Sequence, residues 1–425
     1  MATRRQSLMS LAIHLRGVRI GTLTRGPGTD YTFGYTPQVV AEAGEGAIVL
    51  SHSLPVREEP YDAIETRTFF EGLLPEHSRR DELAREFRLD ANDSYALLAT
   101  IGRDCAGAVV IVPDEEDPSL DDGPVEWLAD EELAQLVDEL PRRPLGMSRR
   151  GQKMRLSLAG VQRKLVLVRS GSGGFGVPTA DAPSTHLIKP EYEHEYPGLA
   201  HNEMFCMSVA RCLGLPAAET TLISIGERPC LVSRRFDRGS EGSETVRLHQ
   251  EDLCQALAVP SNLKYESDLG PGFGRIRDLL GEIGRGADVR TMVRAAVMNF
   301  VLGNSDAHGK NFAILFAEMG RELAPLYDVV STAVYELDDE MAMAIGDNFD
   351  PESVSMADWL DMSSDCDLAP KPFFSLVRDT AADVEACARG VAALARADKW
   401  HVPLIDQIVA VAERRAGRIA SELVP

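Results

Sequence analysis

The chain has 425 residues, of which 44% are hydrophobic and 26% are charged. These proportions are typical of a globular protein with a sizeable core, and the length suggests about two to three domains. The 66 acidic residues outnumber the 44 basic ones, which gives a formal net charge of -22. Because nucleic-acid phosphates repel an acidic protein, we do not expect direct binding of DNA, although a basic partner could bind.

Neither the cysteines nor the N-terminus indicate a special class of protein. Seven cysteines are dispersed and no Cys-x-x-Cys occurs, which predicts reduced, mostly buried thiols in a cytoplasmic protein. Arg4-Arg5 precedes a short apolar stretch that His14 and Arg16 interrupt, so we expect no twin-arginine signal. No run of 18 apolar residues exists, so we expect no membrane span.

The first hundred residues alternate between strand and helix patterns. Apolar and polar residues alternate around a turn at Arg16-Gly17, which is typical of a hairpin. We therefore predict a small α+β domain over residues 1–115. Its expected elements are a hairpin over 9–23, a strand over 31–35, helices over 63–74, 79–87 and from 94, and a strand over 108–112.

Two stretches of unusual composition separate this region from the rest of the chain. Residues 113–125 are acidic and contain three prolines, whereas residues 141–151 are basic and contain two. Stretches that are rich in charge and proline favour linkers or surface crossings. We therefore predict a linker or crossing segment over residues 116–150.

From residue 151 onward, strands come first and long helices follow. The glycine-rich stretch 170–176 has no helix start after it, so it predicts a hairpin turn rather than a phosphate-binding loop. The order is typical of a protein-kinase-like bilobal domain with a mainly helical large lobe, expected over residues 151–425. The elements are strands over 165–168, 185–189, 221–225 and 230–233, and helices over 202–213, 291–302, 373–395 and 404–423.

One loop, over residues 303–311, carries the strongest functional signal. Asp306 and Asn311 are separated by four residues, as in the kinase catalytic loop H-R-D-x-x-x-x-N. There the aspartate accepts the proton of the substrate hydroxyl and the asparagine holds Mg²⁺. Asp328 follows after an apolar run and a turn, and its carboxylate suits the same hard cation. Taken alone, the loop could also be an ordinary polar turn.

Phosphate binding has its own candidates upstream of this loop. Lys189 ends an apolar strand and could pair with phosphates, and Glu203 near the start of the next helix could pair with that lysine. The alternatives are a solvated lysine and an acid favoured by the helix dipole. Small residues further upstream would let backbone amides approach phosphate oxygens. The candidate phosphate loop consists of Ala159, Gly160, Val161, Gln162, Arg163 and Lys164.

Further candidates lie on both sides of the site. Arg234, Arg235 and Phe236 follow a strand where a kinase hinge carries adenine through backbone groups, or they are ordinary surface residues. We expect His308 to support its loop by hydrogen bonds rather than to transfer protons, because no serine or cysteine nucleophile is paired with it. Lys310 could contact the γ-phosphate or the substrate, or be solvated.

Together these motifs resemble the HipA-type serine/threonine kinases, the toxin half of bacterial HipBA toxin–antitoxin modules. The resemblance extends over nearly the whole chain. In the N-terminal part it rests on FFEGLLPE at 69–76 and IGRDCAGAV at 101–109. In the kinase part it rests on SLAGVQRK at 157–164, THLIK at 185–189, NE at 202–203, RFDR at 235–238, QEDLCQ at 250–255, KYES at 264–267, GNSDAHGKN at 303–311 and YD at 327–328.

The resemblance implies a role for each matched residue. Asp306 would be the catalytic aspartate, Asn311 and Asp328 would bind Mg²⁺, and Lys189 would bind ATP phosphates. Residues 159–164 would form the phosphate loop, and residues 234–236 would contact adenine. Ser157 would be autophosphorylated. That modification adds a charge of about -1.5 to -2 where nucleotide phosphates should bind, so it should switch the kinase off.

The resemblance also implies a biological setting. Family members phosphorylate protein serines, with an aminoacyl-tRNA synthetase as the known target type, and thereby arrest growth. It implies a protein substrate, a small basic helix-turn-helix antitoxin of the HipB type, contact with DNA mainly through that antitoxin, and a dimer within the antitoxin complex. Two alternatives stay open: a small-molecule phosphotransferase of kinase-like fold, and a non-enzymatic co-repressor that acts with an antitoxin.

Overall fold

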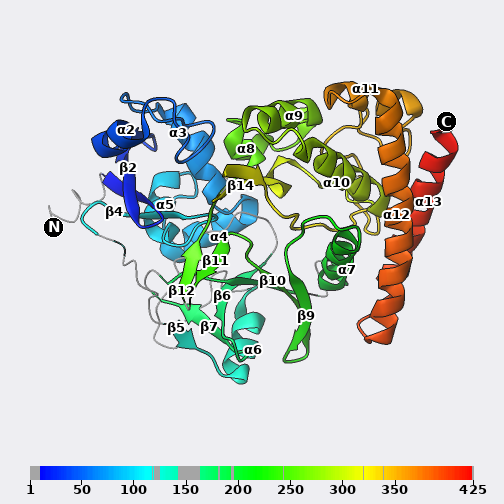
Figure 1. The fold of residues 1–425 in the computed structure, drawn as a ribbon. Helices are drawn as coiled ribbons and strands as arrows, with labels where there is room; N and C mark the ends of the chain where they lie inside the picture. Colours follow the sequence, from blue (N-terminus) through cyan, green and yellow to red (C-terminus); the bar gives the residue numbers. More distant parts are fainter. Residues whose placement is uncertain are drawn as a thin grey trace.

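The computed structural model is a mixed α+β protein, which confirms the predicted fold class (Figure 1). The prediction on Ser157 and those on the phosphate-loop residues 159–162 lie outside the described part of the chain. No helix in the described part is both long and apolar enough to cross a bilayer. The described residues are 10–116, 118, 125–141, 163–179, 182–192, 196–242, 244–318, 320–337 and 339–423.

A four-stranded antiparallel sheet, in the order β3-β2-β1-β4, forms the base of the N-terminal domain. The predicted hairpin is confirmed: at its turn, Arg16 and Gly17 have left-handed backbone angles (φ 50° and 78°). Phe33 of the sheet packs against Phe70 of a covering helix. The elements are β1 (Ser10–Leu15), β2 (Val18–Arg25), β3 (Tyr31–Tyr35), α2 (Pro37–Ala43), α3 (Ala63–Phe70), η1 (Glu71–Leu73), α4 (His77–Phe87), α5 (Ser94–Ile101) and β4 (Val109–Pro113).

A second, six-stranded antiparallel sheet follows, in the order β5-β7-β6-β8-β10-β9. The glycine-rich stretch joins two of its strands, with Gly173 at φ 96°, so the predicted hairpin turn is confirmed. Two helices, α6 (Asp130–Glu139) and α7 (Leu199–Cys212), contact this sheet, and α7 also contacts helices of the large lobe (Figure 1). The elements are β5 (Val125–Trp127), α6 (Asp130–Glu139), β6 (Leu165–Arg169), β7 (Phe175–Pro178), β8 (His186–Pro190), α7 (Leu199–Cys212), β9 (Thr220–Ile225) and β10 (Arg228–Arg234).

Part of the segment predicted as a linker is structured. β5 pairs with β7 at the edge of the second sheet, and Leu133, Leu136 and Val137 of α6 fill the core of that sheet. An acidic and a basic stretch, both containing prolines, flank these residues and hid their helical spacing. Residues 125–139 therefore belong with the second sheet.

The large lobe is mainly helical, as predicted. α12 and α13 lie side by side along one edge of the molecule (Figure 1). Val377, Val384 and Val391 repeat every seven residues on α12, with alanines between them, so one face of this helix enters the core. The elements are β11 (Arg238–Glu241), β12 (Glu244–Arg247), β13 (His249–Asp252), α8 (Leu253–Ala256), η2 (Ser261–Leu263), η3 (Glu266–Asp268), α9 (Phe273–Glu282), α10 (Asp288–Leu302), η4 (Gly309–Asn311), β14 (Ala313–Ala317), β15 (Gly320–Leu323), α11 (Met356–Asp365), α12 (Pro370–Ala397) and α13 (Pro403–Glu422).

The expectation that all cysteines are reduced is contradicted at one pair. Cys212 at the end of α7 and Cys387 in α12 form a disulfide. The fold brings these two residues together although 175 positions separate them, which the dispersed spacing in the sequence does not reveal. The other five cysteines are free and buried, as expected.

Candidate active site

Two cavities meet at Asp328, which lines both of them. The inner cavity, of about 140 Å³, has Lys189, Phe236 and Tyr327 among its lining residues. The outer cavity, of about 770 Å³, contains Asp306 in its wall. Asp328 has φ 58°, a left-handed conformation that is uncommon outside glycine and that clusters at functional sites. The two cavities provide separate places for a donor and an acceptor.

The loop that carries Asp306 is anchored to the helix before it. α10 ends at a glycine, Gly303, whose φ of 75° turns the chain sharply away from the helix. The backbone N–H of Asn304 donates to Asn299 O (2.8 Å), and its side-chain amide donates to Asn299 Oδ1 (3.0 Å). These bonds fix the backbone two residues before Asp306.

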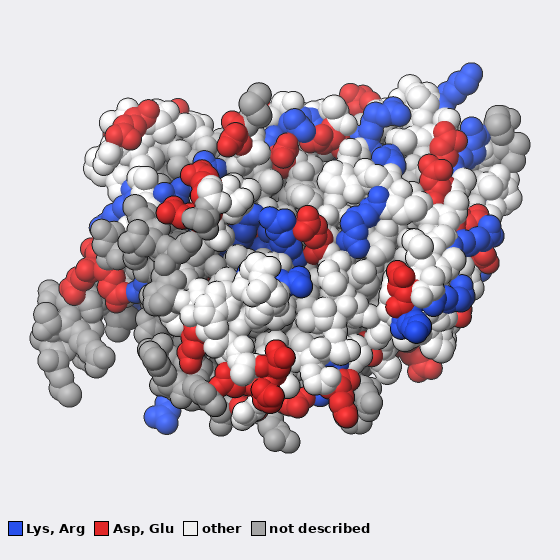
Figure 2. All heavy atoms as spheres, turned by 60° about the horizontal axis from the view of Figure 1, so that its bottom comes forward, with Lys and Arg blue, Asp and Glu red and all other residues white. Residues whose placement is uncertain are grey.

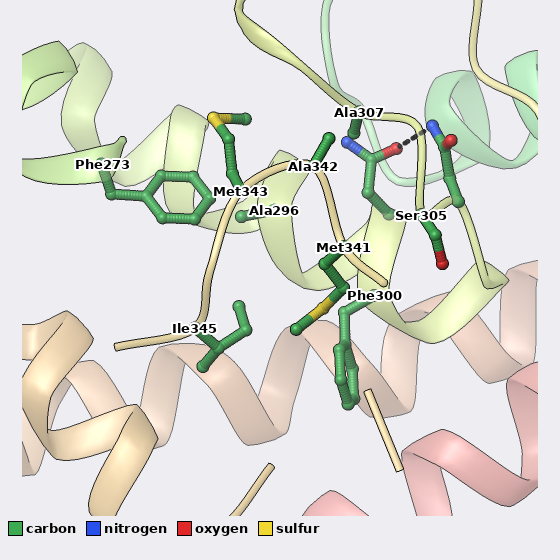
Figure 3. Close-up of a pocket in the computed structure, with 11 residues that line it drawn as sticks. Phe273, Ala296, Phe300, Ser305, Ala307, Met341, Ala342, Met343 and Ile345 are labelled. Atoms are coloured by element: carbon green, nitrogen blue, oxygen red, sulfur yellow. Dashed lines mark hydrogen bonds between the residues drawn. The ribbon is translucent and has the colours of Figure 1, made fainter. Parts of the chain in front are cut away.

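A small apolar pocket backs the same loop (Figure 3). Its volume of about 20 Å³ is close to what one water molecule needs, so the side chains around it are nearly close-packed. Ser305 and Ala307, on either side of Asp306, belong to its wall. The loop is therefore supported by the core of the large lobe. The other lining residues are Phe273, Ala296, Asn299, Phe300, Asn304, Met341, Ala342, Met343 and Ile345.

Asp306 itself is exposed to the outer cavity and is oriented by one hydroxyl group. The hydroxyl of Tyr265 donates to Asp306 Oδ1 at 2.9 Å. Desolvation by the walls of the cavity raises the pKa of Asp306, and Lys264 and the Tyr265 hydrogen bond oppose that rise. An accessible carboxylate with a raised pKa is suited to accept a proton from a hydroxyl group.

Lys189 joins two carboxylates at the boundary of the inner cavity. Its ammonium lies 2.7 Å from Glu203 Oε1 and 2.6 Å from Asp328 Oδ1. Burial opposes the charge of Lys189, but Asp328 and Glu203 outweigh it and raise its pKa. Burial raises the pKa of Glu203 to about 7, while Lys189 keeps that of Asp328 low, at about 2. The lysine–glutamate pair, one of the two alternatives that the sequence left open for Glu203, is therefore present.

His308 and Lys310 are both buried in this structure rather than solvated. Burial lowers the pKa of His308 to about 3, so its imidazole is neutral and packs edge-on against Tyr265. The ammonium of Lys310 lies 3.3 Å from Asp252 Oδ2 and 3.3 Å from Glu76 Oε1, and it lines the inner cavity. The solvated alternative for Lys310 is wrong.

The residues predicted to carry adenine line the inner cavity, but two of their backbone N–H groups are engaged. Arg234 N–H donates to Glu219 O (2.8 Å), and Arg235 N–H donates to Thr185 O (2.9 Å). These two donors are therefore already engaged within the protein and are not available to a base. Phe236 stacks near Tyr327, with ring centroids 5.3 Å apart, and gives the cavity an apolar wall.

Only the last two residues of the candidate phosphate loop are described, and they face different cavities. Lys164 lines the inner cavity, where burial and the charge of Lys189 lower its pKa to about 8. Arg163 lines the outer cavity, 3.6 Å from Glu82 Oε1. The end of the loop thus delivers positive charge to both cavities.

Asn311 and Asp328 fit the ligand set of a hard divalent cation. They offer an amide oxygen and a carboxylate in the wall of the outer cavity. The backbone N–H of His308 donates to Asn311 Oδ1 at 3.1 Å, which orients the amide. Among the described residues, no group of three or more His, Cys, Asp or Glu side chains could hold a metal. A cation here would therefore need phosphate oxygens, as Mg²⁺ commonly does.

The sequence indicated no role for three residues that the structure places in the site. Glu76 from the N-terminal domain reaches the inner cavity, and Lys264 and Tyr265 line the outer one. They stand in the motifs at 69–76 and 264–267, whose order was visible in the sequence. Their contacts were not, because Glu76 and Lys264 are 188 positions apart.

The buried lysine–glutamate pair, the accessible loop aspartate and the candidate Asn–Asp ligand pair are the features of a kinase-like phosphotransferase. Family models agree with this class: the model for the HipA N-terminal domain matches residues 11–112, and the model for the HipA-like C-terminal domain matches residues 156–388. The chain belongs to the HipA family and is a homologue of serine/threonine-protein kinases.

Similar proteins come from several bacteria. A putative kinase, Y4mE, of Sinorhizobium fredii is 39% identical over 336 residues, which cover 77% of this chain and 78% of that protein. The serine/threonine-protein kinase toxin HipA of Shewanella oneidensis is 32% identical over 362 residues, 81% of each chain. A solved complex of Shewanella oneidensis HipA with HipB and operator DNA contains a chain of TM-score 0.82 and 27% identity, with 97% of this chain and 98% of that chain covered.

Proposed function

We propose that this protein is an ATP- and Mg²⁺-dependent protein serine/threonine kinase that acts as the cytoplasmic toxin of a type II toxin–antitoxin module. The observation that carries the proposal is the position of Asp328 at the junction of the two cavities, with Lys189 on the inner side and Asp306 on the outer. A nucleotide in the inner cavity and a serine or threonine in the outer one would meet at this junction.

The residues of the chain divide the work of phosphoryl transfer. Lys189, held by Glu203, would bind nucleotide phosphates, with Lys164 as a second cation beside it. Asn311 and Asp328 would hold Mg²⁺, which neutralises charge on the phosphates when bound. Asp306, oriented by Tyr265, would accept the proton of the acceptor hydroxyl.

The net charge of the chain bears on its partners, and an added phosphate charge would bear on its regulation. The Shewanella relative is found with HipB and operator DNA, and a small basic antitoxin would suit the net charge of -22. Contact with DNA would run mainly through that antitoxin, in a dimeric complex. The acidic surface is uneven: one face carries a group of basic side chains near its centre (Figure 2).

Phosphorylation of Ser157, seven residues before Lys164, would place negative charge near the phosphate site and switch the kinase off.

The test uses purified protein, ATP labelled at the γ-phosphate, Mg²⁺ and a bacterial lysate, with an Asp306→Gln variant as the matched control. We expect labelled protein bands, including an aminoacyl-tRNA synthetase, only with the wild type. Phosphopeptide mapping of the wild type should identify phosphorylated Ser157. Label that enters metabolites alone would show a small-molecule phosphotransferase instead. If the wild type binds no ATP in the presence of Mg²⁺, the non-enzymatic co-repressor role would be preferred over both kinase activities.

A further inference from the structure

Glu76 of the N-terminal domain lies between two lysines of the kinase domain. Its Oε2 is 3.0 Å from Lys264 Nζ, and its Oε1 is 3.3 Å from Lys310 Nζ. All three residues are buried, with relative exposures of 5–8%. Burial alone would favour the protonated acid, but Lys310 and Lys264 outweigh it and lower the pKa of Glu76. The carboxylate is therefore a shared counter-ion for two ammonium groups.

The backbone that presents Glu76 is attached firmly to the kinase domain. Gly72 O accepts a bond from Lys310 Nζ (3.3 Å), and Gln255 Nε2 donates to Phe69 O (2.9 Å). A side chain at Gly72 would meet Gln255 Cγ at 2.8 Å, so the two domains approach closely here. His77, directly after Glu76, has φ 46°, an uncommon angle that only a well-determined surrounding maintains. The direction of Glu76 is thus set by both domains.

Each of the two lysines belongs to a segment that holds the catalytic loop. Next to Lys264 is Tyr265, whose hydroxyl donates to Asp306 Oδ1 (2.9 Å). The carbonyl oxygen of Lys264 accepts the N–H of Gly309 (3.3 Å). Lys310 is four residues after Asp306 in the same loop. Glu76 therefore connects the segment that orients Asp306 with the loop that carries it.

We propose that Glu76 is a positioning residue for phosphoryl transfer, through which the N-terminal domain completes the active site. This inference rests on the kinase activity proposed above. Without the carboxylate, two buried ammonium groups would repel each other and lose a partner, so their segments would shift. Lys310 lines the inner cavity and would keep Asp252 as a partner. Nucleotide binding should survive, while the geometry at Asp306 should not.

The experiment compares full-length wild type, Glu76→Gln, Glu76→Asp and Glu71→Gln. Glu71 is a nearby acid whose carboxylate accepts the hydroxyl of Ser94 instead, and it serves as the control. The readouts are kcat and the KM for ATP in a phosphoryl-transfer assay, together with binding of a fluorescent ATP analogue and the melting temperature. The last two do not depend on turnover.

We expect Glu76→Gln to lower kcat by about 10- to 100-fold, as small misplacements of catalytic groups do, with the KM for ATP within about twofold of the wild type. Glu76→Asp should recover part of kcat, and Glu71→Gln should match the wild type. A normal kcat for Glu76→Gln, or losses of kcat, ATP binding and melting temperature in parallel, would overturn the positioning role. A wild type without transfer activity would instead overturn the proposed function, and the inference with it.

Discussion

The ammonium of Lys189 lies 2.6 Å from Asp328 Oδ1, so the lysine proposed to bind phosphates pairs directly with the aspartate proposed to hold Mg²⁺. Both groups are charged, and Glu203 shares the same lysine at 2.7 Å. Because Mg²⁺ and nucleotide phosphates offer each group a new partner, binding of the nucleotide should separate this pair. We therefore expect the cluster to exchange this internal ion pair for contacts with a bound nucleotide.

Substitutions of Lys189 and of Glu203 should differ in their effect on the free energy of unfolding. Lys189→Met leaves Asp328 and Glu203 without their cation, and we expect a loss of about 3 kcal/mol, the scale of a broken buried pair. Glu203→Gln should cost less than about 1 kcal/mol, because a carboxyl with a pKa of about 7 already tolerates a proton. Urea unfolding measures both values. A larger loss for Glu203→Gln than for Lys189→Met would contradict this view of the cluster.

The N-terminal domain should depend on Asp104 for its attachment. Asp104 Oδ1 lies 2.7 Å from Arg238 Nη2, and its Oδ2 lies 3.5 Å from Arg235 Nη1, with all three side chains buried. Asp104→Asn should cost about 3–5 kcal/mol in guanidinium unfolding. Asp114→Asn, which removes a half-exposed pair with Arg19 in the same domain, should cost less than about 1 kcal/mol. Equal midpoints for the two variants would exclude the proposed attachment.

Glu251 should make stability depend on pH. It is buried at the contact between the domains, where the N–H of His52 donates to its Oε1 at 3.0 Å, and burial raises its pKa to about 7. The unfolded value is about 4.3, so the folded state binds more protons between these two values. Its stabilising contribution is full below about pH 4.3 and is lost as pH rises through 7.

Glu251→Gln is neutral at every pH and tests this contribution. Relative to the wild type, the variant should gain stability steadily as pH rises from about 4.5 to 7.5. Other groups with shifted pKa values, such as Glu266, cancel in the comparison because both proteins contain them. Thermal unfolding at several pH values measures the difference. A difference that stays constant across this range would show that Glu251 does not titrate as described.

The disulfide between Cys212 and Cys387 predicts a simple thiol count. The protein has seven cysteines, and five are free. Unfolded without reductant, the protein should react with five equivalents of a thiol reagent, and with seven after reduction. Since the bond closes a long loop, its reduction should lower the melting temperature. Seven thiols before reduction would show that the pair is not bonded in solution.

Features of the site that depend on local pattern were predictable. Short stretches of sequence are enough to predict three of them. These are the spacing of Asp306 and Asn311, the strand that ends near Lys189 and the helix that contains Glu203. The structure brings Lys189 and Glu203 together, which was one of the two alternatives for Glu203. Periodicity of apolar residues also located the hairpin of the first sheet and the long helices of the large lobe.

Features of the site that depend on contacts between distant residues could not be predicted from the sequence. Glu76 contacts Lys264 and Lys310 only because two domains pack together, and no local pattern marks such a pair. The engaged N–H groups of Arg234 and Arg235 follow from the pairing of neighbouring segments, which periodicity does not specify. The helix over 130–139 was hidden by the charged stretches around it. The sequence indicates whether a segment is a helix or a strand. It does not indicate which polar side chains are buried or which distant residues they contact.

The most direct test of the account is the rate of phosphoryl transfer by Asp306→Gln, measured at saturating ATP and Mg²⁺ beside the wild type. Asp306 is exposed and its carboxylate accepts a hydrogen bond from the Tyr265 hydroxyl at the surface, so the variant should fold and bind ATP normally. We expect its rate to fall by about 10²- to 10⁴-fold, the usual contribution of a general base. A variant that binds ATP and transfers phosphate at the wild-type rate would contradict the assignment of Asp306.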